Sequence, residues 1–466
     1  MFGTEDHVHS TKRCRKIIST QYIKESSSPR TAFFMYSQVL IFHFLVILPS
    51  LKNVHMKHSV KIWINCIIGL IFLGAATATI ITHIPEKEEK AKYIFLFIGD
   101  GMGSPIVSLT ESYMSYKAGQ LGGERLSFSN FPYFGAVTTH SADRAITCSA
   151  AAGTAIATGH KTNNGLLGRN PAGEPLRSFA YDLKDEGYKI GILTNTPVNH
   201  ATPACFYSTP SKRSDHYEIL KALASSNFDF IAGTGFKGYF GDKENDLDSE
   251  TLLKNAGYEI FWGKEEYAQR TSEPEKTILC QAHNKGKEAK EYFVDGFERT
   301  ESFKLSEFLT ACLDSFGDEE PFFIMCEGGN IDWIAHTNKT IPTVKLVQEM
   351  DDAVKLAYEF YSKHPDETLI VVTADHDTGG VAIGFGNAWM GDLLHWNILD
   401  SAWNAAGGRN VLEWEENRKL NESAFIGWPT SHHTGDNVPV YAIGKGAERF
   451  SGKMDNTDFR AKILAE

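Results

Sequence analysis

Five short apolar segments, rich in Ile, Val and Phe and bounded by Gly, Asp or Thr, limit the folds open to this chain. They are Tyr93–Ile98, Ile190–Leu193, Phe322–Cys326, Leu369–Thr373 and Val438–Ile443. Near-continuous apolar runs of this length are typical of strands buried on both faces of a sheet. The stretches between them suit helices: Ser149–Thr158, Pro175–Glu186, Ser214–Ala224 and Pro342–Ser362. This alternation predicts an α/β fold with a central, mostly parallel sheet flanked by helices on both faces.

Two longer intervals interrupt the alternation. Residues 235–300 are polar and rich in Lys, Glu and Gly, and residues 381–428 carry Trp, Asn and Gly. We expect both to be insertions at the edge of the sheet that cap the active site. A chain of 466 residues accommodates one large domain with insertions, which we assign to residues 79–466.

The N-terminal region carries the pattern of an export signal. A basic stretch, Met56–Lys61, precedes an apolar run from Ile62 to about Ile81, and Ala76–Ala78 fits the small-x-small cleavage pattern. We predict a signal peptide at residues 56–78 and export to the periplasm or another extracytoplasmic space. An uncleaved membrane anchor is the alternative, because about 20 apolar residues span a bilayer. Residues 1–55 fit neither pattern and indicate a misassigned start or an N-terminal extension outside the fold.

The charge balance argues against nucleic acid as a partner. The formal net charge is −12, and residues 79–466 hold 37 basic and 55 acidic residues, a net charge of −18. Nucleic-acid-binding domains favour a basic face. An anionic substrate would therefore need local positive charge, for which bound metal ions are the leading candidates. The seven cysteines form no CxxC pair, which argues against a thiolate zinc site.

Polar residues follow three of the predicted strands directly. Asp100 follows Tyr93–Ile98, and Glu327 follows Phe322–Cys326. Asp375 and His376 come just after Leu369–Thr373. Open α/β sheets bind ligands at the carboxyl ends of their strands, so we expect these four side chains to converge on one crevice.

Further metal-ligand types lie nearby in the sequence. Asp332 and His336 stand four residues apart, so on a helix they share one face and can chelate a divalent cation. Alone, the pair is more typical of a solvated helix surface than of a metal site, and His433 is equally typical of an exposed loop. Together with the residues at the strand ends, they form a mixed N/O set that suits zinc, and the oxygen-rich remainder suits magnesium.

Ser149 is the candidate nucleophile. It opens the Ala-rich stretch Ser149–Thr158, which predicts a helix ended by Gly159. A helix N-terminus favours an anion through its free N–H groups and its dipole. A plain capping serine is the alternative. Cys148 is a second candidate nucleophile, which we rank below Ser149 because phosphate chemistry beside zinc favours the oxygen.

These segments, taken together, resemble the alkaline phosphatase family. The resemblance lies in six blocks that occur in the family's order over residues 95–445. They are Phe95–Gly103, Thr147–Gly165, His200–Ala204, Glu327–His336, Thr373–Gly380 and His433–Gly435. One block would be weak evidence, but six in order identify the chain as a member.

The resemblance implies two zinc sites and one magnesium-type site. The first zinc site would comprise Asp332, His336 and His433. The second would comprise Asp100, Asp375 and His376, with Ser149 beside them. The third site would comprise Asp100, Thr202 and Glu327.

The resemblance also implies the reaction. Ser149 would attack a phosphate monoester and become phosphorylated, and hydrolysis of the phosphoserine would release inorganic phosphate. Arg213 lies eleven residues after Thr202, where the family has the arginine that binds two phosphate oxygens. Whether the chain forms a homodimer is left open. Contact with a membrane is expected only through the N-terminal segment.

Three residues depart from the family's pattern. Cys148 stands where many members have the Asp that helps to position the arginine, so we expect Arg213 to be more mobile here. His200 stands where some members have Asp, and Trp333 where others have Lys or His. The occupant of the third site therefore stays open among magnesium, zinc and cobalt.

Two alternatives to a monoesterase remain. The same metal scaffold serves phosphodiesterases, although these commonly lack the Ser-Ala-Ala helix. A non-catalytic, exported metal-binding protein would have lost a ligand or the nucleophile, and none is missing. Sulfatases need Cys or Ser in a C/S-x-P-x-R context, whereas Ser149 is followed by three alanines.

Overall fold

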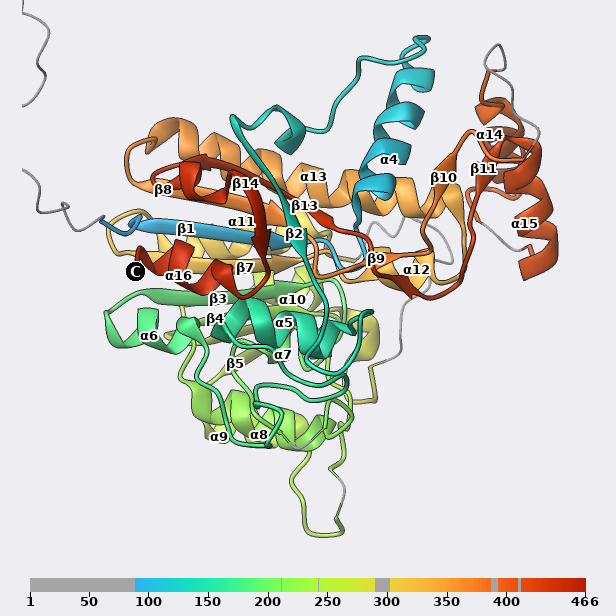
Figure 1. The fold of residues 1–466 in the computed structure, drawn as a ribbon. Helices are drawn as coiled ribbons and strands as arrows, with labels where there is room; N and C mark the ends of the chain where they lie inside the picture. The colour runs from blue at the N-terminus through green and yellow to red at the C-terminus, as the bar shows by residue number, and fades with distance from the viewer. Residues whose placement is uncertain (1–88, 211, 242, 290–301, 387–392, 410–411) are drawn as a thin grey trace, which may run out of the picture. The chain divides into compact units, whose positions relative to one another are not determined.

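A ten-stranded sheet forms the centre of the computed structural model, which describes residues 89–210, 212–241, 243–289, 302–386, 393–409 and 412–466 (Figure 1). The strand order is β14-β2-β13-β8-β1-β7-β3-β4-β6-β5. The strands are β1 (Tyr93–Ile98), β2 (Tyr133–Thr138), β3 (Lys189–Thr194), β4 (Phe230–Gly233), β5 (Glu259–Trp262), β6 (Thr277–Cys280), β7 (Phe322–Glu327), β8 (Thr368–Thr373), β13 (Val438–Gly444) and β14 (Gly452–Asp455).

The middle of the sheet is parallel and in register. Strand β1 lies between β7 and β8, and Ile98 at its end is paired with Glu327 on one side and Thr373 on the other. Every residue of these three strands is buried, as their continuous apolar sequences predict. Strand β13 alone runs antiparallel to its neighbours, β8 and β2. The predicted α/β fold with a mostly parallel sheet is confirmed.

Helices cover both faces of the sheet. In Figure 1, α13 lies behind it, whereas α5 and α16 lie in front. The larger helices are α4 (Ser104–Lys117), α5 (Ser149–Thr158), α8 (His216–Ser226), α11 (Leu305–Phe316) and α13 (Thr340–Lys363), and the shorter ones include α6 (Phe179–Asp185), α7 (Ala201–Ala204), α12 (Asn330–Ala335) and α16 (Asp458–Leu464). Helix α5 has the predicted bounds, and Gly159 ends it with a φ of 77°.

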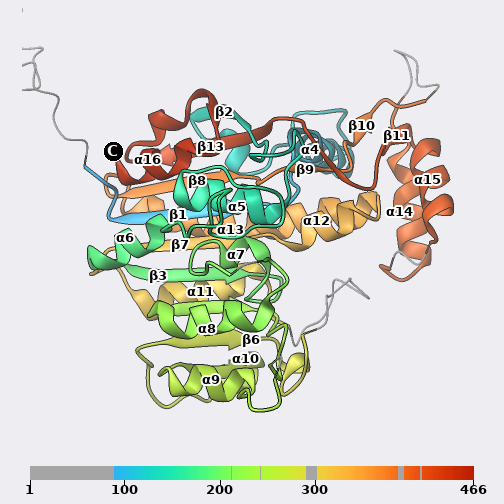
Figure 2. The same ribbon diagram turned by 60° about the horizontal axis from the view of Figure 1, so that its bottom comes forward.

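The two polar intervals have different structures. Residues 235–300 contribute β5 and β6, the last strands at one edge of the sheet, with α9 (Ser249–Asn255) nearby (Figure 2). Residues 381–428 form the separate antiparallel pair β10 (Ala382–Ile383) and β11 (Ile426–Gly427). They also form α14 (Trp396–Ala405) and α15 (Trp414–Ser423). These two helices stand apart from the β5 edge in both views (Figures 1 and 2).

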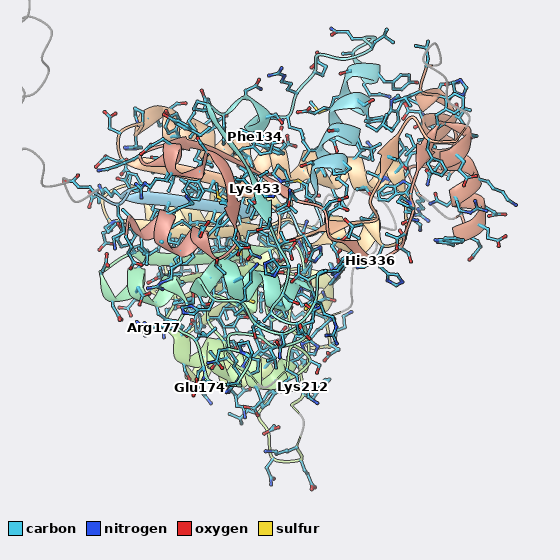
Figure 3. The ribbon with its side chains drawn as sticks, viewed as in Figure 1. Phe134, Glu174, Arg177, Lys212, His336 and Lys453 are labelled. Carbon is cyan, nitrogen blue, oxygen red and sulfur yellow. The ribbon has the colours of Figure 1, made fainter. Side chains whose placement is uncertain are left out.

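The opposite edge of the sheet meets solvent. Phe134 on β2 is 56% exposed, and Lys453 on the edge strand β14 is exposed as well (Figure 3). In strand β2, only Gly135 and Val137 are buried and the residues between and around them are partly or fully exposed, which explains why no continuous apolar run marks it in the sequence.

The predicted extension 1–55 and leader 56–78 lie outside the described residues. Within the described residues, no helix has both the length and the apolar character needed to cross a bilayer. The five cysteines of this part of the chain are all free: Cys148, Cys205, Cys280, Cys312 and Cys326.

Candidate active site

Three adjacent strands place carboxylates at the carboxyl-terminal end of the sheet. Asp100 lies two residues after β1, Glu327 is the last residue of β7, and Asp375 lies two residues after β8. Because β1 pairs in register with both neighbours, the ends of the three strands lie side by side. All three side chains are fully buried, and so is His376. The structure thus brings together the four side chains that the sequence analysis placed in one crevice.

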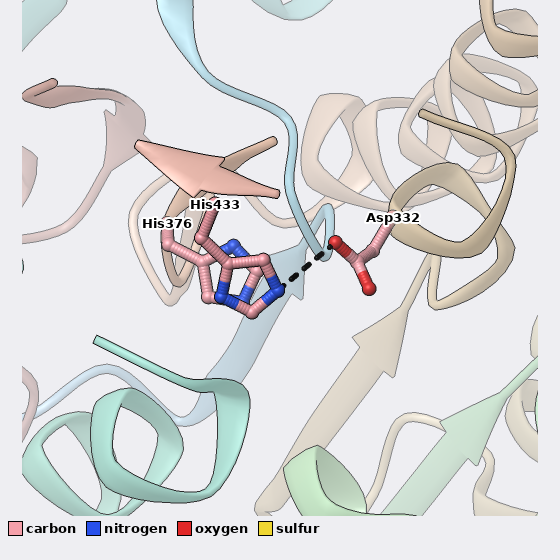
Figure 4. A group of neighbouring side chains, drawn as sticks. All are labelled: Asp332, His376 and His433. Atoms are coloured by element: carbon pink, nitrogen blue, oxygen red, sulfur yellow. Dashed lines mark ion pairs between the residues drawn. The ribbon is translucent and has the colours of Figure 1, made fainter. Parts of the chain in front are cut away.

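Asp332 lies next to both His336 and His433, and the ligand atoms that lie within 4.8 Å of one another around it are those of Asp332, His376 and His433. Asp332 lies on α12, and its Oδ2 is 3.2 Å from Nε2 of His336 at the end of that helix. Its Oδ1 is 3.5 Å from Nε2 of His433 (Figure 4). Strand β12 (His433–Thr434) pairs with β9 (Asp377–Thr378), which stacks the rings of His433 and His376 with their centroids 3.6 Å apart.

A second group surrounds His376. Its Nε2 lies 3.4 Å from Asp100 Oδ1 and 3.4 Å from Asp375 Oδ2. Ser149 Oγ lies 3.3 Å from the same nitrogen. Ser149 is the first residue of α5 and is buried, and Cys148 occupies the N-cap position without a capping side-chain hydrogen bond. The predicted nucleophile therefore stands beside two carboxylates and an imidazole.

A third group lies on the other side of Asp100. Thr202 Oγ1 is 3.5 Å from Asp100 Oδ2, and His200 Nδ1 is 4.0 Å from Glu327 Oε1. Ligand atoms of Asp100, His200 and Glu327 all lie within 4.8 Å of one another. In the sequence, His200 is marked only as a departure from the family's pattern, whereas the structure places its imidazole among these carboxylates.

Arg213, Trp333 and Cys148 lie around these groups. Arg213 Nη2 is 3.3 Å from His200 Nε2. The ring of Trp333 meets the ring of His200 edge to face at 5.3 Å, and Lys237 Nζ lies 5.8 Å from the centre of the Trp333 ring. Cys148 Sγ accepts a hydrogen bond of 3.2 Å from Gly165 N.

Three threonines that the sequence analysis missed orient the acidic side chains. Thr378 Oγ1 donates to Asp332 Oδ1 at 2.5 Å and lies 3.3 Å from His376 Nδ1. Thr194 and Thr196 both donate to Glu327 Oε2. Thr194 ends β3, the neighbour of β7. Its position at a strand end was the one sequence signal that could have placed it near Glu327.

The residues present fit divalent cations. Asp100 Oδ1, Glu327 Oε1, Asp375 Oδ2 and His200 Nδ1 are buried and have no hydrogen-bond partner. Leaving buried polar or charged atoms unpaired costs several kcal/mol, so such atoms point to a partner that is a ligand. The donors are carboxylate oxygens and imidazole nitrogens, the set that zinc and magnesium use.

Burial controls the protonation of these groups. Burial, with a smaller contribution from the charge of Asp332, raises the pKa of Asp375 to about 8 and that of Glu327 to about 7. Burial and the charge of Asp375 also raise the pKa of Asp100. Burial acts in the same direction on Asp332, but the hydrogen bond to His336 and the neighbouring imidazoles lower its pKa overall. Crowded carboxylates of this kind favour a positive partner.

Comparison with known proteins assigns the family. The sequence model of the family described as alkaline phosphatase matches residues 91–465. The chain belongs to the alkaline phosphatase family. It is 30% identical to alkaline phosphatase 4 of Bacillus subtilis over 445 residues, which cover 84% of this chain and 93% of that protein. This membership confirms the predicted family and identifies a phosphatase that hydrolyses phosphate esters.

Solved alkaline phosphatase structures share the fold. The cold-active enzyme of a psychrophilic Shewanella species superposes with a TM-score of 0.69 at 26% identity, covering 80% of this chain and 99% of that one. The enzyme of the Antarctic bacterium TAB5 gives a TM-score of 0.65 at 26% identity, with 81% and 98% covered.

The Thr378 hydroxyl yields a first prediction. Replacing Thr378 by Val keeps the shape and removes the hydrogen bond that orients Asp332. Losing such a contact behind a ligand typically costs about 10–100-fold in metal affinity, so we expect a loss of that size. Thr343→Val is the matched control, because this buried residue's hydroxyl donates to the carbonyl oxygen of Lys339, the N-cap residue of α13, away from the ligand groups. Zinc affinity measured against a competing chelator checks this, and equal affinities in the two variants would contradict it.

The raised carboxyl pKa values yield a second prediction. Without cations, folded protein keeps protons on Asp375 and Glu327 that the unfolded chain releases above about pH 5. The stability of metal-free protein therefore falls as the pH rises from about 5 to about 8. A bound cation removes this penalty. We expect zinc and magnesium to raise the melting temperature more at about pH 8.5 than at pH 6, in thermal scans of chelator-treated protein. An equal or larger gain at pH 6 would refute the charge argument.

Proposed function

We propose that this phosphatase hydrolyses phosphate monoesters to an alcohol and inorganic phosphate, with a phosphoserine formed at Ser149. The observation that carries the proposal is the 3.3 Å separation of Ser149 Oγ and His376 Nε2, next to Asp100 and Asp375. A hydroxyl beside three buried metal-ligand side chains is suited to nucleophilic attack rather than to helix capping.

In the proposed reaction, Ser149 is the nucleophile and Arg213 binds the phosphate. Ser149 Oγ attacks phosphorus in line with the leaving oxygen, whose bond to phosphorus breaks. The serine proton passes to solvent, and the leaving oxygen takes up a proton from solvent to give the alcohol. The N-terminus of the ten-residue helix α5 directs free N–H groups and a partial positive charge at the same point. Arg213, half-buried at the rim, holds two phosphate oxygens and neutralises their growing charge. Water then displaces the phosphate from Ser149.

We propose two zinc ions and one magnesium ion as cofactors, with zinc or cobalt as alternatives in the third site. Asp332, His336 and His433 would hold the first zinc. Asp100, Asp375 and His376 would hold the second, next to Ser149. Asp100, Thr202 and Glu327 would hold the third ion. When bound, such ions supply Lewis-acid charge that lowers the pKa of the serine hydroxyl and stabilises the leaving oxygen.

The orphaned buried atoms of Asp100, Asp375 and Glu327 support this assignment. A solved relative adds support for the third ion. A histidine-to-aspartate mutant of the TAB5 enzyme, 26% identical to this chain, has Mg bound in its M3 site.

We also propose that the protein is exported through residues 56–78. Sequencing the N-terminus of secreted protein tests this step, because cleavage after the Ala76–Ala78 pattern leaves Thr79 as the first residue. Protein that stays in the membrane with residues 56–78 attached would indicate an anchor instead.

The nucleophile yields a third prediction. Ser149→Ala should lower kcat for p-nitrophenyl phosphate by ~10³-fold or more, because a nucleophile acts as a unit with its partners. The wild type should hydrolyse the monoester far faster than bis-p-nitrophenyl phosphate, and a chelator should abolish turnover.

Ser178→Ala is the matched control for Ser149→Ala. Ser178 caps α6 by accepting a hydrogen bond from Ala180 N, so its loss should cost about 1 kcal/mol of stability and leave kcat unchanged. If Ser149→Ala behaves like this control, Ser149 has only a structural role at the start of α5. A faster rate for the diester would identify a phosphodiesterase, and metal binding without any turnover would identify a binding protein.

A further inference from the structure

His200 joins two parts of the site that the proposed function treats separately. The residue is 6% exposed and directly precedes α7. Its Nε2 lies 3.3 Å from Arg213 Nη2, and its Nδ1 lies 4.0 Å from Glu327 Oε1. The edge-to-face contact with Trp333 limits rotation of the ring. One imidazole therefore faces the proposed phosphate-binding arginine with one nitrogen and the third ligand group with the other.

The contact with Arg213 determines where the ring hydrogen lies. A guanidinium group only donates hydrogen bonds, so Nε2 must present its lone pair to Arg213. A neutral imidazole has one lone pair and one N–H, so the hydrogen lies on Nδ1. On that side, His200 Nδ1 and Glu327 Oε1 are both buried without a hydrogen-bond partner. The arrangement gives Arg213 a hydrogen-bond acceptor and leaves Nδ1 of His200 and Oε1 of Glu327 without a partner.

We propose that His200 couples cation binding at Asp100, His200 and Glu327 to the release of Arg213 for phosphate. A cation binds Nδ1 only through a lone pair, so the ring loses its proton at Nδ1 and gains one at Nε2, both exchanged with solvent. The ring stays neutral throughout. Nε2–H and the Arg213 N–H then face each other as two donors, and the contact is lost. Arg213 becomes available to the substrate only when the third group is filled.

Thermodynamic linkage makes this coupling reciprocal. Phosphate that draws Arg213 away from Nε2 leaves that nitrogen free to carry the hydrogen, and so strengthens cation binding at Nδ1. This inference rests on the proposed role of Arg213 in phosphate binding. Couplings between sites are typically about 5–150-fold, so an effect of roughly tenfold is expected.

Two variants separate the two nitrogens. His200→Asn keeps a possible metal-ligand atom near the position of Nδ1 and removes any group near Nε2. His200→Gln keeps an oxygen near Nε2 that can accept from Arg213 and removes the ligand at Nδ1. The experiment uses full-length protein loaded with two equivalents of zinc and titrated with Mn²⁺, with and without inorganic phosphate. The electron paramagnetic resonance signal of free Mn²⁺ reports its affinity.

The ratio of Mn²⁺ affinities with and without phosphate is the deciding quantity. Direct attraction between phosphate and Mn²⁺ contributes to this ratio in every variant. The comparison with His200→Asn therefore isolates the part of the ratio that depends on the imidazole of His200. We expect a ratio of about ten in the wild type and a ratio at least threefold smaller in His200→Asn. In His200→Gln, we expect weaker Mn²⁺ binding. Equal ratios in the wild type and His200→Asn, or unchanged Mn²⁺ affinity in His200→Gln, would overturn the proposal.

Two further measurements keep the result unambiguous. If phosphate inhibits Arg213→Gln as strongly as the wild type, the role of Arg213 in the proposed function fails. If phosphate inhibition does depend on Arg213 but the ratio does not depend on His200, only the coupling fails. In wild-type protein labelled with ¹⁵N-histidine, diamagnetic Mg²⁺ with phosphate should move the ring hydrogen of His200 from Nδ1 to Nε2. An unchanged tautomer would refute the mechanism without any variant.

Discussion

Uncompensated negative charge at the ends of three parallel strands is the constraint on which the rest of the site depends. Asp100, Glu327 and Asp375 are fully buried, and each has an oxygen without a hydrogen-bond partner. Protein interiors rarely tolerate ionised groups in this state, because taking a carboxylate out of water costs several kcal/mol. The raised pKa values of Asp375 and Glu327 express that cost. The cluster is therefore built for partners with positive charge.

The fold produces this cluster because strand register leaves little freedom. Strand β1 pairs in step with β7 and β8, so residues just past the strand ends meet whatever their sequence separation. Helix α5 brings Ser149 to the same edge, and the β9–β12 pair brings His433 against His376. A chain with a net charge of −12 thereby concentrates its need for cations at one point, where an anionic substrate can be bound despite the overall repulsion.

The sequence predicted the centre of the sheet and most of the cluster, for a physical reason. Buried parallel strands are continuous apolar runs, and polar residues at their ends stand out against them. Strands β4, β5 and β6 have four residues each, and β2 is half-exposed, so neither length nor pattern marked them. The contact between His200 and Arg213 joins residues thirteen apart in the sequence and depends on tertiary packing. Neither periodicity nor spacing carries that information, and the same is true of the Thr378 bond to Asp332.

The proposed function depends on phosphorylation of Ser149, and trapping the phosphoserine is the direct test of it. Fully metallated enzyme turning over p-nitrophenyl phosphate is quenched in acid, where phosphoserine is stable, and digested with trypsin. Mass spectrometry should find phosphate on Ser149 in the peptide that spans residues 145–161 and none in Ser149→Ala. Turnover without phosphate on this peptide, or phosphate on another residue, would contradict the account.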